Sequence, residues 1–233
     1  MADIHNRFNR FRAEFLPYAD YVVVAGDITN AGRSVRIDPD AYDNLQRARA
    51  WLDSLRSQYG GSRVIVIPGN HDIGCHSSEF GEGFCEPSTV HTLAPALGDA
   101  ALVVCWTESL CTAFDAPELS LSWAHTTSDP GVDLARWALC PEVDVIISHC
   151  PPHGARDLAI SGARIGSPGL AEAIRRVRPK LVVCGHVHED SGIKVLAHEG
   201  GNTLVVNCAK SVGVAEVTEA GASWSPAAWK RSA

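Results

Sequence analysis

The sequence predicts an α/β fold in its first part and a β-rich region at its end. Short runs of Val and Ile recur from residue 21 to residue 184, stretches with helical spacing lie between them, and after residue 190 the helical spacing stops. Runs that are apolar throughout are typical of strands covered on both faces. Because single α/β domains often reach 233 residues, we expect one domain over residues 1–233.

Four buried strands and a group of later strands are predicted. The buried strands are "YVVVA" (21–25), "RVIVI" (63–67), "DVIIS" (144–148) and "LVVC" (181–184). After residue 190, the segments "IKVLAHE", "NTLVVN" and "SVGVAEV" are predicted to be short strands joined by Gly and Asn turns.

Apolar residues spaced three or four apart predict three helices. The patterns are Phe8, Phe11 and Phe15; then Leu45, Ala48, Leu52, Leu55 and Tyr59 after Asp38-Pro39; then Leu170, Ile174 and Val177 after Ser167-Pro168. Proline in the first turn is a common start signal for a helix. Residues 75–100 have no clear period and are rich in Gly, Ser and Pro, so we expect either a functional loop or a surface insertion there.

Composition and charge exclude some classes of function. The formal net charge is -7 and the chain has no basic stripe, which disfavours binding to an extended nucleic acid. The first residues lack the apolar core of a signal peptide, and no apolar run approaches the ~20 residues that span a bilayer. We therefore expect a soluble cytoplasmic protein without a membrane partner. The eight cysteines include no Cys-x-x-Cys pair, so buried free thiols are favoured over zinc bound by thiolates.

A polar cluster follows each of the predicted buried strands. The clusters are Gly26-Asp27, then Gly69-Asn70-His71-Asp72, then His149, then Gly185-His186-Val187-His188, and Asp3-Ile4-His5 stands before the first helical pattern. Ligands of open α/β sheets bind at the carboxyl ends of the strands. Glycines let the backbone pass close to a ligand. An isolated His-x-His is often a pair of surface histidines, but this explanation does not account for all five clusters.

The side chains in these clusters favour a metal centre. Nitrogen and oxygen ligands without sulfur suit Mn, Fe, Zn, Co or Ni. Seven candidate ligands are too many for one tetrahedral ion and suit two divalent ions about 3.5–4 Å apart that share one carboxylate. The candidate ligands are Asp3, His5, Asp27, Asn70, His149, His186 and His188.

All five motifs, in this order, resemble those of the calcineurin-like metallophosphoesterases, and the resemblance covers nearly the whole chain. It implies a four-layer fold in which two mixed β-sheets pack face to face between outer helices. It also implies that Asp3, His5, Asp27 and His188 hold one ion, and that Asp27, Asn70, His149 and His186 hold the other. The implied reaction is hydrolysis of a phosphate ester by a hydroxide that bridges the two ions.

The same resemblance suggests roles for residues that are not ligands. His71 would protonate the leaving group or stabilise the charge of the transition state, with Asp72 orienting its ring; a purely structural role for His71 is the alternative. Arg156 would contact the substrate phosphate or be a solvated loop residue. Trp123 is predicted to fill the core, although stacking on a base is the alternative.

The substrate and the activity are left open between several alternatives. The segment from His149 to Gly192 looks most like small prokaryotic phosphoesterases related to cyclic-nucleotide phosphodiesterases. The partner is then a small phosphate ester, either a phosphodiester or a phosphomonoester. The alternative is a binding scaffold of the same fold with little activity, as the retromer subunit of this family implies. The sequence does not predict the oligomeric state.

The first motif lacks the strand that precedes it in the family. Only Met1 and Ala2 stand before Asp3, whereas strands usually have ~5 residues. Either the sheet lacks one strand or the natural chain is longer. We expect Asp3 and His5 to lie on a fraying terminus, and the ion held by Asp3, His5, Asp27 and His188 to be the more weakly bound of the two.

Overall fold

The computed structural model describes residues 1–30, 41–67, 69–72, 91–93, 103–106 and 144–227. Its α-helices are α2 (Ala41–Tyr59) and α6 (Pro168–Val177). Short 3-10 helices are η1 (Phe8–Arg10), η2 (Ala13–Phe15), η3 (Gly61–Arg63), η4 (Asn70–Asp72) and η7 (His188–Asp190). The strands are β1 (Val22–Ala25), β2 (Val64–Ile67), β3 (His91–Leu93), β4 (Val103–Trp106), β5 (Val145–Ser148), β6 (Leu181–Cys184), β7 (Gly192–His198), β8 (Gly201–Asn207), β9 (Gly213–Thr218) and β10 (Gly221–Pro226).

The four predicted buried strands are present and pair in parallel. β1 pairs with β2, and β5 pairs with β6 in a six-stranded mixed sheet of order β3-β4-β5-β6-β8-β7. The three strands predicted after residue 190 are β7, β8 and β9, and β10 completes an antiparallel hairpin with β9. Strands β3, β4 and β10 were not predicted. Because β1 and β2, and likewise β5 and β6, run in parallel, the loops that leave each pair emerge at a common edge.

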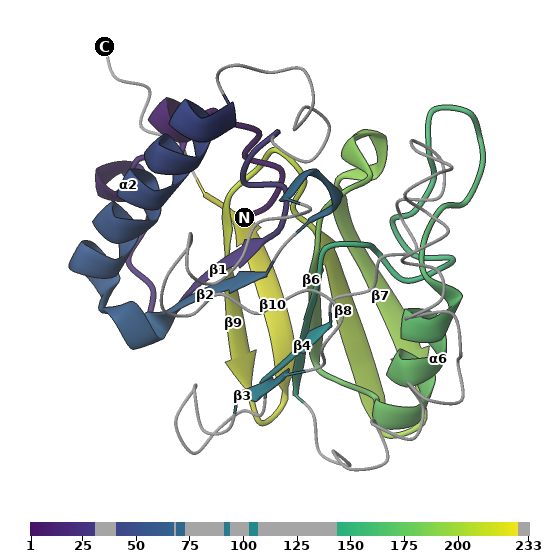
Figure 1. Ribbon diagram of the computed structural model, residues 1–233. Coiled ribbons are helices and arrows are strands. Elements are labelled where there is room, and N and C mark those ends of the chain that lie inside the picture. The colour runs from purple at the N-terminus through teal and green to yellow at the C-terminus, as the bar shows by residue number, and fades with distance from the viewer. Residues whose placement is uncertain (31–40, 68, 73–90, 94–102, 107–143, 228–233) are drawn as a thin grey trace.

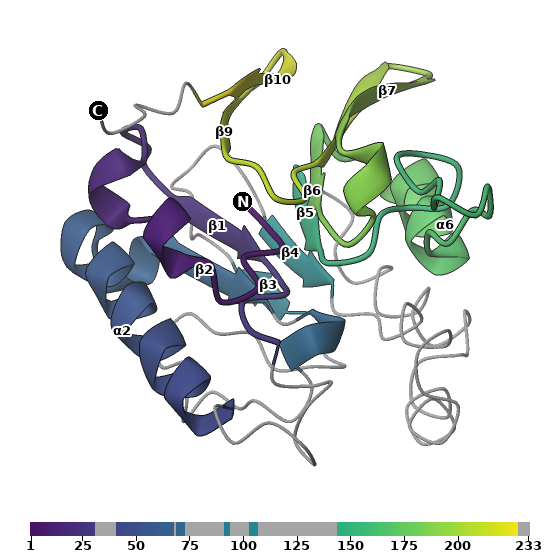
Figure 2. The ribbon, with the colours of Figure 1, turned by 90° about the horizontal axis from the view of Figure 1, so that it is seen from above.

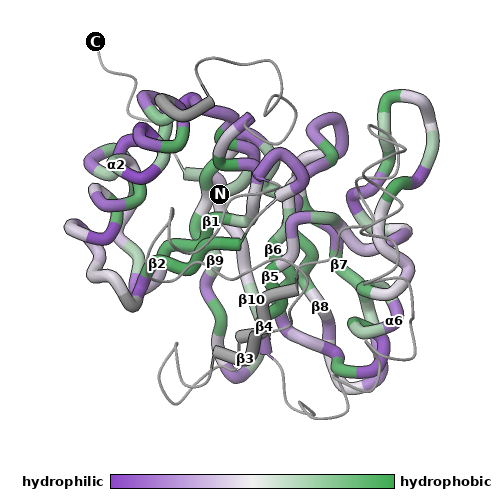
Figure 3. The backbone as a smooth tube through the Cα atoms, in the orientation of Figure 1, coloured by the Kyte–Doolittle hydropathy of each residue, from purple (hydrophilic) through white to green (hydrophobic). Residues whose placement is uncertain are grey.

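The elements lie in layers (Figures 1 and 2), and three clusters of apolar side chains connect them. One face of β1 and β2 packs on α2, and their other face shares a core with β5, β6, β8 and the hairpin of β9 and β10. The opposite face of β5, β6 and β8 packs on α6. Figure 3 shows the hydrophobic residues concentrated on β1 and β2, as expected for strands covered on both faces. The fold is thus α/β with mixed sheets and helices outside them, and the predicted pair of face-to-face sheets is seen in part.

Two of the three predicted helices form. Helix α2 carries the Leu45–Tyr59 pattern, and α6 begins at Pro168, where the Ser167 hydroxyl caps it by accepting a hydrogen bond from the Leu170 amide at 3.0 Å. Within the described residues, no helix combines the length and the hydropathy needed to cross a bilayer.

The helix predicted from Phe8, Phe11 and Phe15 is wrong. The chain forms η1 and η2 instead, and Arg12 between them is extended, with φ -62° and ψ 140°. The break takes the Phe11 carbonyl out of any continuous helix, and the buried Trp51 indole of α2 donates to it at 2.7 Å. A tertiary hydrogen bond therefore replaces the local helical one, while Phe8 and Phe11 are still buried.

The first residues are more firmly held than we expected. Met1, Ala2 and Asp3 are buried, and Ala2 forms a parallel bridge with Ala209. Backbone hydrogen bonds join Ala25 N to Met1 O at 2.8 Å, Asp3 N to Gly26 O at 3.0 Å and Lys210 N to Ala2 O at 3.2 Å. The prediction of a fraying terminus is therefore wrong, because this short segment is bonded to chain on both sides.

The cysteines follow the prediction only in part. Cys184 and Cys208 are buried free thiols, as expected. Cys150, which follows the predicted ligand His149, is disulfide-bonded. Most of residues 75–100, where a functional loop or a surface insertion was predicted, lies outside the described residues, as does Trp123.

Candidate metal centre

The predicted ligands converge at one edge of the strands. Within the described residues, three groups of His and Asp side chains each bring their ligand atoms within 4.8 Å of one another. The groups are Asp3, His5 and His188; His5, Asp27 and His71; and Asp27, His149 and His186. Asp27 belongs to two of the groups. This is the position that a shared, bridging carboxylate requires.

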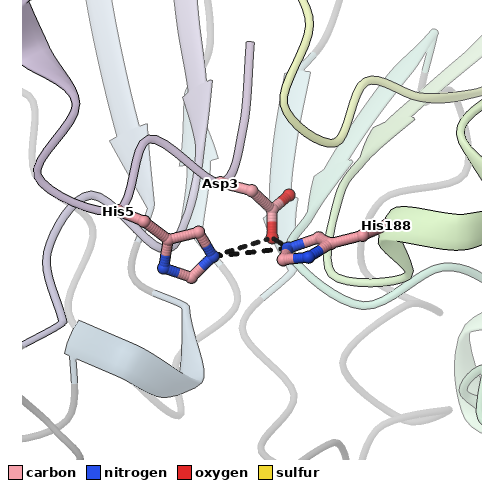
Figure 4. A group of neighbouring side chains, drawn as sticks. All are labelled: Asp3, His5 and His188. Atoms are coloured by element: carbon pink, nitrogen blue, oxygen red, sulfur yellow. Dashed lines mark hydrogen bonds and ion pairs between the residues drawn. The ribbon is translucent and has the colours of Figure 1, made fainter.

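Asp3, His5 and His188 form the first cluster (Figure 4). The Nε2 atom of His188 lies 2.8 Å from Asp3 Oδ1 and 3.3 Å from His5 Nε2. The Nδ1 atom of His5 lies 2.8 Å from the side-chain oxygen of Asn30 and donates to it. In the neutral ring the proton is therefore on Nδ1, and the lone pair of Nε2 points toward Asp3 and His188, as in a metal ligand held by a neighbouring acceptor. Asn30 was not predicted. Its position in the loop that begins with Asp27 is the feature of the sequence that could have indicated its role.

The second cluster gathers Asn70, His149 and His186 around the other side of Asp27. His149 Nδ1 donates to the carbonyl of Ala25 at 2.9 Å, so in the neutral ring its Nε2 carries the lone pair. That Nε2 lies 3.0 Å from Asn70 Oδ1 and 3.3 Å from Asp27 Oδ2, and His186 Nδ1 lies 2.9 Å from the same Asn70 oxygen. Several electron-rich atoms thus face one another, and this donor set fits a divalent cation.

The pKa values of these groups show that the cluster favours positive charge. Burial alone would lower the pKa of His149, but the negative charge of Asp27 and its hydrogen bond raise it to about 10. Burial and the nearby charge of His149 lower the pKa of His186 to about 4, which leaves its imidazole neutral, the form that binds metals. Burial tends to raise the pKa of Asp3, yet its hydrogen bond with His188 holds it well below its usual range. Without metal, a proton on His149 supplies this positive charge, and a bound metal ion would take the place of that proton.

The backbone at the ligands is held in an unusual conformation. Positive φ angles occur at Asp3 (57°), His5 (48°), Asp27 (53°) and His186 (70°). Residues other than Gly adopt this region at a cost that the surrounding structure must offset, and such residues gather at functional sites. Four predicted ligands therefore adopt this region, as do Asn6, Arg156, Arg178 and Lys210, which are not predicted ligands.

Three glycines allow the loops to approach one another, as the sequence predicted. A Cβ atom on Gly69 would lie 2.2 Å from Asp27 Oδ1, and one on Gly185 would lie 2.4 Å from Asp3 Oδ2. A Cβ atom on Gly26 would lie 2.5 Å from His149 Nδ1. Any side chain at these positions would push a predicted ligand out of place.

His71 faces the site from η4. Its ring centroid lies 4.8 Å from that of His5, its Nε2 lies 3.9 Å from Asp27 Oδ2, and its backbone N–H donates to Asp27 Oδ1 at 2.8 Å. This position beside the shared carboxylate agrees with a role in the chemistry, which stays a prediction.

The carboxylate of Asp72 binds backbone groups of two loops. Its two carboxylate oxygens accept hydrogen bonds from the backbone N–H groups of Gly69 (3.0 Å), Ile28 (3.1 Å) and Thr29 (2.9 Å) and from the Thr29 hydroxyl (2.9 Å). Burial and the charge of Asp27 raise its pKa to about 6. These contacts fasten the loops after β1 and β2 together, and the orientation of the His71 ring by Asp72 stays a prediction.

Arg156 is already engaged by protein groups. Its Nε donates to the Ile193 carbonyl at 2.7 Å, and its Nη1 pairs with Asp190 at 3.0 Å. These contacts brace the loop after β5 against the turn that carries His188. The contact with a substrate phosphate stays a prediction.

Comparisons with known proteins agree with this geometry. A relative from Homo sapiens, "Metallophosphoesterase domain-containing protein 1", is 28% identical, over 89% of this chain and 64% of its own length. "UPF0046 protein T07D4.2" from Caenorhabditis elegans is 38% identical, over 85% of this chain and 52% of its own length. The chain therefore spans about two thirds or less of these relatives.

A solved structure shows the same fold. The protein TT1561 of Thermus thermophilus superposes with a TM-score of 0.57 at 11% identity, over 98% of this chain and 97% of its own. The model of the family described as "Calcineurin-like phosphoesterase" matches residues 1–190, the region that holds every predicted ligand. The chain belongs to the calcineurin-like phosphoesterase family.

Proposed function

We propose that this protein is a metal-dependent phosphoesterase that hydrolyses a small phosphate ester at a dinuclear centre. The placement of Asp27 carries the proposal. Its Oδ2 lies 3.7 Å from His5 Nε2 on one side and 3.3 Å from His149 Nε2 on the other. One carboxylate oxygen thus faces a ligand of each predicted ion, which suits two neighbouring metal sites.

The residues that would hold the two ions divide into two sets. Asp3, His5, Asp27 and His188 would hold the first ion, and Asp27, Asn70, His149 and His186 would hold the second. Two divalent ions bound here would neutralise charge on the phosphate oxygens and lower the pKa of a water between them. The protein contributes the orientation of the ligands, because Asn30 fixes the ring of His5 and the Ala25 carbonyl fixes that of His149.

His71 is the side chain best placed to act on the leaving group. Its ring edge lies beside His5 and Asp27, and it is not required as a ligand in either set. We assign it to donating a proton to the departing oxygen or to stabilising the charge that forms there.

The substrate class and the metal form the finer part of the proposal. The segment from His149 to Gly192 resembles phosphoesterases of the cyclic-nucleotide-phosphodiesterase type, which favours a phosphodiester such as a cyclic nucleotide. A net charge of -7 favours a small ester over extended nucleic acid. Nitrogen and oxygen ligands favour Mn²⁺ or a similar first-row ion.

A substrate panel with defined metals tests the proposal. Bis-p-nitrophenyl phosphate, p-nitrophenyl phosphate and cyclic nucleotides would each be offered to the purified protein with Mn²⁺, Fe²⁺, Zn²⁺, Co²⁺ or Ni²⁺. Turnover that requires added metal supports a phosphoesterase, and the preferred ester distinguishes diesterase from monoesterase. A protein that binds two ions but turns over none of these esters would instead be the scaffold of the same fold.

A further inference from the structure

Asn207, the last residue of β8, joins several carbonyl groups beneath the metal-binding turn. It is 1% exposed. Its Nδ2 lies 2.8 Å from the Val187 carbonyl, 3.2 Å from that of Arg156 and 3.3 Å from that of Asp190, while its Oδ1 accepts from Ala209 N at 3.0 Å. All the neighbours of Nδ2 are acceptors, so the orientation of the amide is fixed.

These carbonyls belong to the two segments that carry His149 and His188. Val187 and Asp190 lie on either side of His188, and Arg156 lies in the loop that follows His149. The Asp190 carboxylate strengthens the same connection, because Oδ1 pairs with Arg156 at 3.0 Å and Oδ2 accepts from Leu158 N at 3.1 Å. Asn207 therefore fastens the turn of His188 to the loop after β5.

His188 depends on this connection more than His186 does. The backbone N–H of His186 donates to Asp3 Oδ2 at 2.9 Å, and Gly185 N donates to the His149 carbonyl at 2.9 Å. His186 thus has anchors at its own backbone. The side chain of His188 is 29% exposed, and its turn is held by the carbonyls that Asn207 binds.

We propose that Asn207 is a positioning residue that sets the place of His188, and with it the affinity of the first metal set. The inference rests on the two metal sets of the proposed function, but not on hydrolysis. Hydrogen-bond partners behind metal ligands typically change affinity by about 10–100-fold when they are removed. Replacing Asn207 should therefore weaken one ion and spare the other, whereas a general loss of stability would weaken both.

The test is a calorimetric titration of metal-free protein with Mn²⁺. Asn207→Ala should reduce the affinity for one ion by about 10–100-fold and leave the other within about threefold. Thr203→Val is the matched control, because Thr203 is a buried residue of the same strand whose hydroxyl donates to the Pro179 carbonyl, away from the turn. Both variants should melt at lower temperature, but Thr203→Val should bind both ions as the wild type does.

A double variant identifies which ion is affected. In a His188→Ala background, one ion is already weakened, so adding Asn207→Ala should change the remaining affinity little. Asp190→Ala changes a partly exposed site and should weaken the same ion by a smaller factor. It replaces Asn207→Ala in the test if Asn207→Ala does not fold.

Equal weakening of both ions in Asn207→Ala, or the same pattern in Thr203→Val, would overturn the inference. So would unchanged affinities in both Asn207→Ala and Asp190→Ala. Because no turnover is measured, wild-type protein that binds two ions but hydrolyses no ester would refute only the proposed phosphoesterase activity, and the titrations would still decide the role of Asn207.

Discussion

Adding one methyl group at Gly69 should displace the shared carboxylate. The Cβ of Gly69→Ala would lie 2.2 Å from Asp27 Oδ1 and 2.4 Å from Asp27 N. Non-bonded heavy atoms that involve carbon prefer ~3.5 Å or more, so Asp27 or the η4 loop must move by about 1 Å. The backbone of Gly69 is not in the left-handed region, so the effect comes from this overlap alone. A displacement of about 1 Å at a reacting centre costs about 10²-fold in rate, and overpacking of this kind costs about 1–3 kcal/mol of stability.

Steady-state kinetics, elemental analysis of bound metal and a thermal melt would measure the effect. We expect kcat/KM with any ester that the wild type hydrolyses to fall about 10²-fold, with less metal retained. Gly201→Ala is the control, because its Cβ would meet only His198 Cε1 at 3.7 Å, an ordinary contact. If Gly69→Ala kept the metal content and rate of the wild type, Asp27 would not be held where the structure places it, and the argument for a shared ligand would fail.

Three further substitutions separate metal binding from chemistry. Asp27→Ala should lose both ions in elemental analysis, whereas Asp3→Ala should weaken mainly one; retention of two equivalents by Asp27→Ala would show that it does not bridge. His71→Ala should keep both ions but lose about 10²–10⁴-fold in rate, as expected for a general acid. That loss should shrink for esters with good leaving groups, and an equal loss for good and poor leaving groups would assign His71 to charge stabilisation.

The sequence predicted that the candidate ligands lie together, because most of them follow a local signal. Asp27, Asn70 and His149 come soon after short apolar runs. β1 pairs in parallel with β2, β5 pairs in parallel with β6, and a shared apolar core packs the two pairs together. The glycine at each turn is also visible in the sequence, and its close contact in the structure explains it. Positions that depend on one strand and its next loop were therefore predictable.

The supporting contacts were not predictable, because they join distant segments. The amide of Asn207 binds carbonyls 17, 20 and 51 positions away, and nothing near it in sequence marks this. The carboxylate of Asp72 likewise accepts hydrogen bonds from backbone groups more than 40 positions away, as well as from Gly69, and its place next to His71 in the sequence does not indicate them. The spacing of Phe8, Phe11 and Phe15 predicted a helix. The contact that goes with its interruption, between the Trp51 indole and the Phe11 carbonyl, joins residues 40 positions apart and is not visible in this spacing.

The first metal set should still be the weaker of the two, although for a different reason from the one the sequence suggested. Asp3 is buried and bonded on both sides, so a fraying terminus does not explain it. Exposure is the reason we use instead. The side chains of His188 and His5 are 29% and 10% exposed, whereas that of His149 is 6% exposed; His186 and Asn70 of the second set are also partly exposed. Ligands near water leave an ion easier to rehydrate and release.

Single-site variants distinguish the two sets. His188→Ala should remove the first ion and leave one tightly bound ion, and His186→Ala should leave only the weaker one. Competition with a chelator of known affinity would measure both dissociation constants at the same pH. In the wild type, the first set should lose its ion at a lower chelator concentration than the second set does. If the ion that remains in His186→Ala binds more tightly than the one that remains in His188→Ala, the order of the sites is reversed. Burial of the ligands would then not be what sets metal affinity in this protein.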